Sequence, residues 1–207
     1  MIQHRQTVLT FPTPIHIIDF EEIDFCNRAA EFVRRIKNSK QGVGDKLCWT
    51  TPDDLHTRQE FEELKNLLYI EVEKVLDEVG LIRESFYISC MWANLAKAEN
   101  RHALHLHANS YYSGVIYLEV PYQSGNIGFK DPRASSEMLS FDYTDESIFK
   151  NRTIELEPKQ GRLILFPSWL HHGTRSGNFD NAHDRISLSF NILPKCTVTD
   201  FSRKISL

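Results

Sequence analysis

The stretch Asp184-Arg185-Ile186-Ser187-Leu188-Ser189-Phe190-Asn191-Ile192-Leu193 decides the fold. From Arg185 to Ile192 its polar and apolar residues alternate strictly, and this two-residue period is that of a β-strand with two chemically different faces. The two faces separate four apolar from four polar side chains, Ile186, Leu188, Phe190 and Ile192 against Arg185, Ser187, Ser189 and Asn191. In a one-sided sheet the polar face would point to water, whereas in a jelly roll it can line an internal cavity. The pattern alone leaves both orientations open.

Five further segments show the same period between residues 86 and 166. They are Phe86–Asn94, Tyr112–Val120, Ile127–Lys130, Thr153–Leu156 and Arg162–Phe166. Glycines at positions 125, 161 and 177 mark turns, and no helical pattern interrupts the series. Such a series predicts an antiparallel sandwich or barrel rather than a parallel sheet with crossover helices. The simplest assembly is a mainly β fold with flanking α-helices, built as a jelly roll.

The N-terminal part shows helical periodicity instead. The expected elements are, in order, a strand at Ile15–Ile18, a helix at Glu21–Asn38, a loop at Ser39–Asp53 and a second helix from Thr57 to Gly80. Thr57 and Glu60 have the spacing of a capping box at a helix start, and glycine is a typical helix stop. The length of 207 residues favours one domain. We therefore expect a single domain over 1–207, with a mostly helical part at 1–85, a jelly-roll core at 86–195 and a C-terminal tail at 196–207.

Composition narrows the class of protein. The chain is 41% hydrophobic and 11% aromatic, which is ample for a packed core. The net charge is −4, from 24 basic and 28 acidic residues without a basic cluster, so nucleic acid is not expected as a partner. The first eleven residues carry no secretion signal pattern, and no apolar run spans a bilayer. The four cysteines stand apart without a C-x-x-C motif, as reduced thiols do in a cytoplasmic protein without a membrane partner.

Three histidines and one arginine form the candidate site. On a strand, His105 and His107 face the same way, and the fold must bring His172 to them. Three imidazoles suit a first-row transition metal with open positions. Arg185 is a lone cation on the following strand, and a metal beside a fixed guanidinium can hold a small dicarboxylate. An isolated H-x-H pair is weak evidence, because such histidines also occur on solvated loops. The ordered combination favours a metal site. Of His171 and His172, only one can face a given cavity.

Four segments resemble bacterial and phage putative oxygenases of the Fe(II)- and 2-oxoglutarate-dependent dioxygenase superfamily. They are the first metal-binding segment from His105 to Leu118, the strand that ends in Asp131-Pro132-Arg133, the distal-histidine segment from Gly161 to His172, and Arg185 to Asn191. The resemblance covers roughly Trp92 to Ile192, about half of the chain. Its most specific parts are F-P-S-W-L-x-H and R-I-S-x-S-F-N.

This resemblance implies a double-stranded β-helix, the cupin-like jelly roll, with Fe(II) bound by His105, His107 and His172. It assigns His172 rather than His171 as the distal ligand. It also implies 2-oxoglutarate as cosubstrate, with Arg185 on its far carboxylate and with Asn94 and Asn191 as further cosubstrate-binding candidates. The implied activity is hydroxylation of a C–H bond by O₂, with release of succinate and CO₂. The substrate would be a small molecule or a peptide side chain, and a homodimer and a phage or bacterial origin are compatible.

Four further residues are candidates for contact with the substrate or for an outer layer of the site: Arg133, Tyr112, Trp169 and His102. Arg133 equally fits an ion pair with Asp131, and aromatic residues on strands are commonly core. Residues 134–151 fit either a lid over the site or an ordinary surface excursion.

The first motif departs from the superfamily pattern, because His107 stands where most members carry a carboxylate. A site of three neutral imidazoles makes the metal a stronger electrophile, and zinc also accepts three histidines. Asp131, Asp142 or Asp145 are alternative sources of a carboxylate, and their spacing favours none of them. Two alternatives remain: a cupin-like metalloenzyme that does not use 2-oxoglutarate, and a non-catalytic jelly-roll module that binds a ligand. The glutamate usual in cupins is missing from Ala108–Gly114.

Overall fold

The computed structural model describes residues 6–8, 10–45, 47–133, 138, 141–145, 147, 150, 152–199 and 204–206. Its helices are α1 (Asp24–Asn38) and α2 (Glu62–Glu78), with short 3₁₀ turns at Leu55–Thr57 and Gln59–Phe61. Its strands are β1 (His16–Asp19), β2 (Val43–Gly44), β3 (Cys48–Thr50), β4 (Ser85–Ala96), β5 (His102–His105), β6 (Tyr112–Glu119), β7 (Ile127–Lys130), β8 (Thr153–Leu156), β9 (Arg162–Pro167), β10 (His172–Thr174), β11 (Arg185–Lys195), β12 (Thr197–Thr199) and β13 (Lys204–Ser206).

Two antiparallel sheets form a jelly roll, as the strand pattern predicts. The larger sheet has the order β1-β9-β6-β11-β4-β3-β2, and the smaller has the order β5-β10-β7-β8. All pairings between the described strands are antiparallel. Strands β12 and β13 pair with each other as a separate hairpin. Strand β11 lies in the middle of the larger sheet, between β6 and β4, and therefore carries the register of both neighbours.

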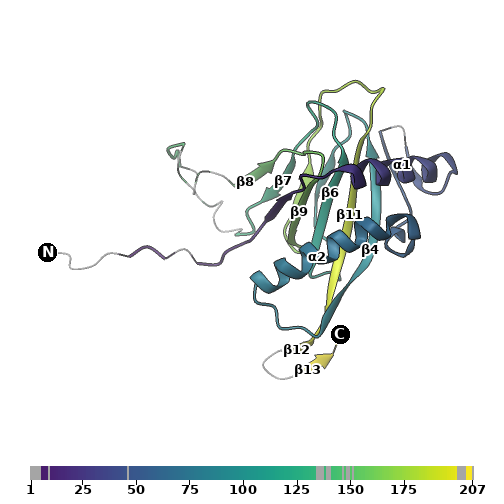
Figure 1. Ribbon diagram of the computed structural model, residues 1–207. Coiled ribbons are helices and arrows are strands. Elements are labelled where there is room, and N and C mark those ends of the chain that lie inside the picture. Colours follow the sequence, from purple (N-terminus) through teal and green to yellow (C-terminus); the bar gives the residue numbers. More distant parts are fainter. Residues whose placement is uncertain are drawn as a thin grey trace.

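Both helices cover the same face of the larger sheet (Figure 1). The apolar residues of β11 contribute to the core on this side, where they pack with Val33 of α1 and Leu68 and Val72 of α2. Ile186, Leu188, Phe190 and Ile192 are all fully buried there. Because side chains alternate along a strand, the polar residues of β11 must point the other way, between the two sheets. The structure thus resolves the orientation that the sequence leaves open.

The helical part differs from expectation at its starts. Helix α1 begins at Asp24 rather than Glu21, after the N-cap residue Ile23. The predicted capping box is wrong, because Thr57 lies in a 3₁₀ turn and its hydroxyl donates to the carbonyl of Asp54. Helix α2 therefore begins only at Glu62.

The predicted helix stop at Gly80 is confirmed. Gly80 has φ +71°. Its N–H donates to the carbonyl of Asp77, and the N–H of Leu81 donates to the carbonyl of Leu76, which together form a Schellman cap.

Neither helix is long and apolar enough to cross a membrane in the part of the chain that the structure describes.

The expected loop at Ser39–Asp53 contains two short strands, β2 and β3, that extend the larger sheet. Strand β3 pairs with the end of β4, with Thr50 opposite Asn94. The sequence gives no alternation here, and pairing with a neighbouring edge supplies the structure instead. Strand β10 is missing from the predicted strands, and β5 ends at His105 although a strand was expected to include His107, because both strands are very short.

Gly114 marks where β6 passes closest to the core side chains of β11. A Cβ atom at this position would lie 2.3 Å from Cζ of Phe190 and 2.8 Å from Cδ2 of Leu165. We expect Gly114→Ala to lower the free energy of unfolding by about 1–3 kcal/mol, the typical cost of overpacking. Urea unfolding measures this change. Gly128→Ala in β7 is the matched control, since its Cβ would meet only atoms at 3.5 Å or beyond. Equal stability of the two variants would contradict the close packing of Gly114 against Phe190 and Leu165.

Candidate metal centre

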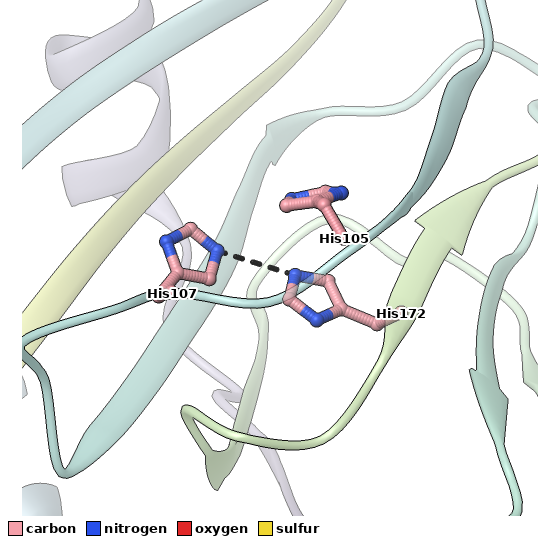
Figure 2. Close-up of side chains that lie close together, drawn as sticks. All are labelled: His105, His107 and His172. Carbon is pink, nitrogen blue, oxygen red and sulfur yellow. Dashed lines mark hydrogen bonds between the residues drawn. The ribbon is translucent and has the colours of Figure 1, made fainter.

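Strand pairing brings the three histidines together. His105 is the last residue of β5, His172 is the first residue of β10, and the antiparallel register places them opposite each other. His107 lies two residues beyond β5, where its backbone N–H donates to the carbonyl of Ser168 at 3.0 Å. The prediction that the first two histidines share a strand is therefore only half right. The three rings nevertheless converge on one point (Figure 2).

The spacing of the ring nitrogens fits a single metal ion. One ligand nitrogen from each histidine lies within 4.8 Å of the others. The Nε2 atoms of His107 and His172 are 3.2 Å apart. Two nitrogens at the usual bond length of about 2.1 Å from one ion, seen at an angle of about 100°, are also separated by about 3.2 Å. Among the described residues, no aspartate, glutamate or cysteine joins this cluster.

Backbone hydrogen bonds select which nitrogen is free on two of the rings. Nδ1 of His105 lies 2.9 Å from the carbonyl oxygen of Ala103, and Nδ1 of His172 lies 2.9 Å from that of Leu170. A carbonyl oxygen only accepts, so each Nδ1 carries the proton and donates it. The lone pair then resides on Nε2, which is the arrangement that metal-binding histidines use.

Burial keeps two of the rings neutral. Desolvation, followed by the charge of neighbouring histidines, lowers the pKa of His107 and of His172 to about 4. Both rings are consequently uncharged at neutral pH. A neutral imidazole is the form that binds a metal, so no proton has to leave these rings when an ion binds.

The cluster borders a cavity of about 170 Å³ between the two sheets. Polar side chains of the central strands face it, namely Asn94, Ser113, Arg185, Ser187 and Ser189. The sequence identifies the alternate positions of β11 as one face, but Ser113 and the cavity-lining Trp92 carry no signal of their own. Trp92 lies beside the metal cluster, with its ring centroid 5.8 Å from that of His107. Among the described residues that line the cavity, none is an aspartate or a glutamate.

Arg185 is a buried cation in this cavity. It is 5% exposed, its Nη1 donates to the carbonyl of Gly125 at 3.0 Å, and its Nε has no hydrogen-bond partner. No carboxylate of the described residues forms an ion pair with it, and desolvation lowers the pKa of the guanidinium. An uncompensated buried charge is unfavourable. The donors that remain on Arg185 therefore make this end of the cavity a site for an anion.

The other predicted residues divide between the cavity and the rest of the molecule. Asn94 lines the cavity, and its Oδ1 accepts a hydrogen bond of 2.9 Å from Thr50, which leaves its amide nitrogen available. His102 also lines the cavity, with its Nε2 3.9 Å from the thiol of Cys48. Asn191 is buried but lies outside the cavity lining, where its amide oxygen accepts from Ser113.

Tyr112, Trp169 and Arg133 lie outside the cavity lining in the described part of the chain. Tyr112 belongs to the core on the helix side of the larger sheet. Trp169 is 52% exposed, and Arg133 forms a two-pronged ion pair with Asp131.

The alternative carboxylates do not reach the histidines among the described residues. Asp142 and Asp145 are exposed, and Asp145 pairs with Lys150. Much of the segment 134–151 lies outside the described residues, so its interpretation as a lid stays a prediction. His171 is exposed, in keeping with its exclusion in favour of His172.

Comparison with known proteins identifies the class. Residues 90–191 match the model of a family described as putative 2OG-Fe(II) oxygenase. These residues are about half of the 207-residue chain and contain the three histidines and Arg185. The chain belongs to this family of non-haem iron, 2-oxoglutarate-dependent oxygenases. No curated protein matches the chain.

Solved structures share the fold. A prolyl-4-hydroxylase from Pseudomonas putida superposes with a TM-score of 0.61 at 14% identity, over 89% of this chain and 94% of that chain. The non-haem α-ketoglutarate-dependent epimerase SnoN from nogalamycin biosynthesis gives 0.66 at 13% identity, over 88% and 78%. HygX from Streptomyces hygroscopicus, solved with nickel and 2-oxoglutarate bound, gives 0.61 at 14% identity, over 88% and 83%.

The low pKa values of the histidines predict how the metal-free protein responds to acid. Between the ordinary histidine pKa of 6.5 and about 4, the unfolded chain binds protons at His107 and His172 that the folded protein does not. The free energy of unfolding should therefore fall as the pH drops through this window. Urea unfolding at a series of pH values measures the slope. The double variant His107→Gln/His172→Gln should flatten the dependence of the free energy of unfolding on pH. An unchanged slope would contradict the low pKa values of these two histidines.

Proposed function

We propose that this protein hydroxylates a C–H bond of its substrate at an Fe(II) ion held by His105, His107 and His172. 2-Oxoglutarate would lie in the cavity, with its far carboxylate on Arg185. One observation carries the proposal: the three convergent imidazoles and a buried guanidinium without a carboxylate partner in the described chain border the same cavity.

Charge explains why a dicarboxylate suits this cavity. Three neutral histidines leave the two positive charges of the ion uncompensated, and Arg185 adds a third. Since the described lining contains no acidic side chain, a ligand with two carboxylates supplies what the protein lacks. One carboxylate would approach the metal, and the other would pair with Arg185 in the two-pronged geometry that guanidinium favours.

When bound, Fe(II) and 2-oxoglutarate supply the oxidative chemistry, which consumes O₂ and releases succinate and CO₂. The protein itself would bind and orient the cosubstrate, and it would exclude water from the metal. Arg185 would fix the far end of the cosubstrate, and the free amide nitrogen of Asn94 can donate to it. Phe166, Val115 and Ile127 contribute apolar wall to the same cavity. Such a wall limits the entry of water beside the metal.

The substrate would approach from the side of the exposed ligand His105. A cavity of about 170 Å³ leaves little space beyond the cosubstrate, so the substrate must contact the rim. We propose a small molecule or a peptide side chain. The structural neighbours include a prolyl-4-hydroxylase and HygX with hygromycin B bound, which fit these two kinds of substrate. Four free thiols also fit a reducing compartment such as the cytoplasm.

Arg185→Met tests the cosubstrate site. The change keeps a flexible unbranched side chain and removes the guanidinium with its charge, so it should abolish tight binding of 2-oxoglutarate while the histidines still bind Fe(II). The measurement is the visible charge-transfer band that 2-oxoglutarate gives on Fe(II) under anaerobic conditions. The matched control is Arg175→Met, because Arg175 is exposed and pairs with Glu155. A band of wild-type strength at equal 2-oxoglutarate concentration in Arg185→Met would exclude this role.

Paired histidine variants test the metal ligands. His172→Ala should weaken binding of Fe(II) by more than the roughly 10–100-fold that loss of an outer partner costs. His171→Ala changes the exposed neighbour and should keep the wild-type affinity. Competition with a chelator under anaerobic conditions measures both. If His171→Ala is the variant that loses the metal, the assignment of the distal ligand is wrong.

A further inference from the structure

Three buried polar side chains form a continuous hydrogen-bonded group behind the metal cluster. Ser168 is 0% exposed, Ser113 is 2% exposed and Asn191 is 7% exposed. The hydroxyl of Ser113 lies 2.8 Å from that of Ser168 and 2.8 Å from Oδ1 of Asn191. They come from β6, from the segment after β9, and from β11, so the group joins three separate parts of the jelly roll. We call it the serine–asparagine group.

The chemistry of the side chains fixes the direction of these hydrogen bonds. The amide oxygen of Asn191 only accepts, so the single hydroxyl proton of Ser113 points to it. Ser168 must then donate to Ser113. The amide nitrogen of Asn191 donates to the thiol of Cys90 at 3.3 Å. Every member consequently has a partner. Removing the hydroxyl of Ser113 leaves Oδ1 of Asn191 and the hydroxyl of Ser168 without these hydrogen bonds, and removing that of Ser168 takes away the donor to Ser113.

Ser168 connects this group to the segment that carries His107. Its carbonyl accepts from the N–H of His107 at 3.0 Å, and its own N–H donates to the carbonyl of Tyr111 at 3.1 Å. Both ends of the segment from His107 to Tyr111 are thus held by one residue. Between them Asn109 has φ +57°, so the chain turns sharply there. The backbone of Ser168 therefore holds the segment that carries His107, and the hydroxyl of Ser168 ties this backbone to Ser113.

The same short segment also leads to His172. Two residues after Ser168, the carbonyl of Leu170 accepts the proton on Nδ1 of His172. The N–H of Leu170 donates to the carbonyl of Pro167 at 2.9 Å, which closes a turn around Ser168. Ser168 consequently lies between the backbone contacts that orient two of the three histidines.

We propose that Ser113, Ser168 and Asn191 are positioning residues for the metal centre, which act by holding the His107 segment and the turn before His172 in one arrangement. This inference rests on the proposed metal site. It gives Asn191 a role through hydrogen bonds to Ser113 rather than through contact with the cosubstrate. Outer partners that orient metal-binding histidines commonly change metal affinity about 10–100-fold when they are lost.

Ser89 offers a control that separates a general loss of a serine hydroxyl from an effect on the histidines. Ser89 of β4 also donates a hydrogen bond to residue 191, from its hydroxyl to the backbone carbonyl at 3.3 Å, but it does not contact Ser168. Ser89→Ala therefore removes a serine hydroxyl from the same sheet without touching the path to the histidines. It is the matched control for Ser113→Ala.

The experiment measures Co(II) binding to the metal-free full-length protein, by competition with a chelator and by the visible spectrum of the bound ion. We expect Ser113→Ala and Ser168→Ala each to weaken Co(II) binding about 10-fold and to alter the spectrum. Their double variant should be no weaker than either alone, because both break one path. Ser113→Thr, which keeps a hydroxyl at this position, and Ser89→Ala should both behave as wild type. Thermal unfolding records the stability of every variant.

Each outcome has a distinct meaning. Reduced stability with unchanged Co(II) affinity and spectrum in Ser113→Ala and Ser168→Ala would overturn the positioning role and leave the metal site intact. If Ser113→Ala does not fold, Ser168→Ala together with Ser113→Thr decides the question by the same readouts. Failure of the wild-type protein to bind Co(II) would overturn the proposed metal site and this inference with it.

Discussion

The alternation of side chains along β11 is the constraint on which the rest of the structure depends. This strand lies in the middle of the larger sheet, so both of its neighbours must follow its register. Its apolar residues face the two helices, and its polar residues face the space between the sheets. A shift of one residue would place Arg185 in the helical core and Leu188 in the cavity. One strand therefore stabilises the domain with one face and shapes the site with the other.

The resulting site has an unusual distribution of charge. The fold buries a guanidinium and keeps two neighbouring imidazoles neutral, and the described cavity lining holds no acidic group. Without a bound ligand, no negative charge in the described lining balances the guanidinium of Arg185, and a buried cation without an anion is unfavourable. A divalent metal adds further positive charge. If the site binds a metal ion as proposed, an anionic ligand at the Arg185 end would balance this charge, and the two ends of the cavity would then fill together.

The sequence predicts much of this fold for a physical reason. Strand β11 alternates clearly, since one of its faces lies in the helix-side core and the other points between the sheets. Strand β6 instead shows as a nearly continuous apolar run, because both of its faces are buried in core clusters. Strand β10, which carries His172, was not predicted, and β5 ends at His105 before the expected His107, because both strands are short and held by pairing rather than by an apolar pattern. The failed capping box has a similar cause. Thr57 satisfies its hydroxyl within a 3₁₀ turn, which the spacing to Glu60 does not reveal.

The site residues were predictable to different degrees. His105, His107, His172 and Arg185 follow from motif order, and the structure brings them to one cavity. Ser113 and Ser168 carry no chemical signal in the sequence, since buried serines are common and only the fold shows that they meet. Asn191 stands on the polar face of β11, yet its partners Ser113 and Cys90 come from both neighbouring strands. Such contacts depend on register across three strands, which local sequence does not specify.

The most direct test of the central claim is a crystal structure of the protein with Fe(II) and 2-oxoglutarate under anaerobic conditions, with anomalous scattering at the iron edge. We expect one iron peak at bonding distance, about 2.1 Å, from Nε2 of His105, His107 and His172. We also expect the far carboxylate of 2-oxoglutarate against the guanidinium of Arg185. Iron bound elsewhere, or 2-oxoglutarate bound away from Arg185, would contradict the proposed site.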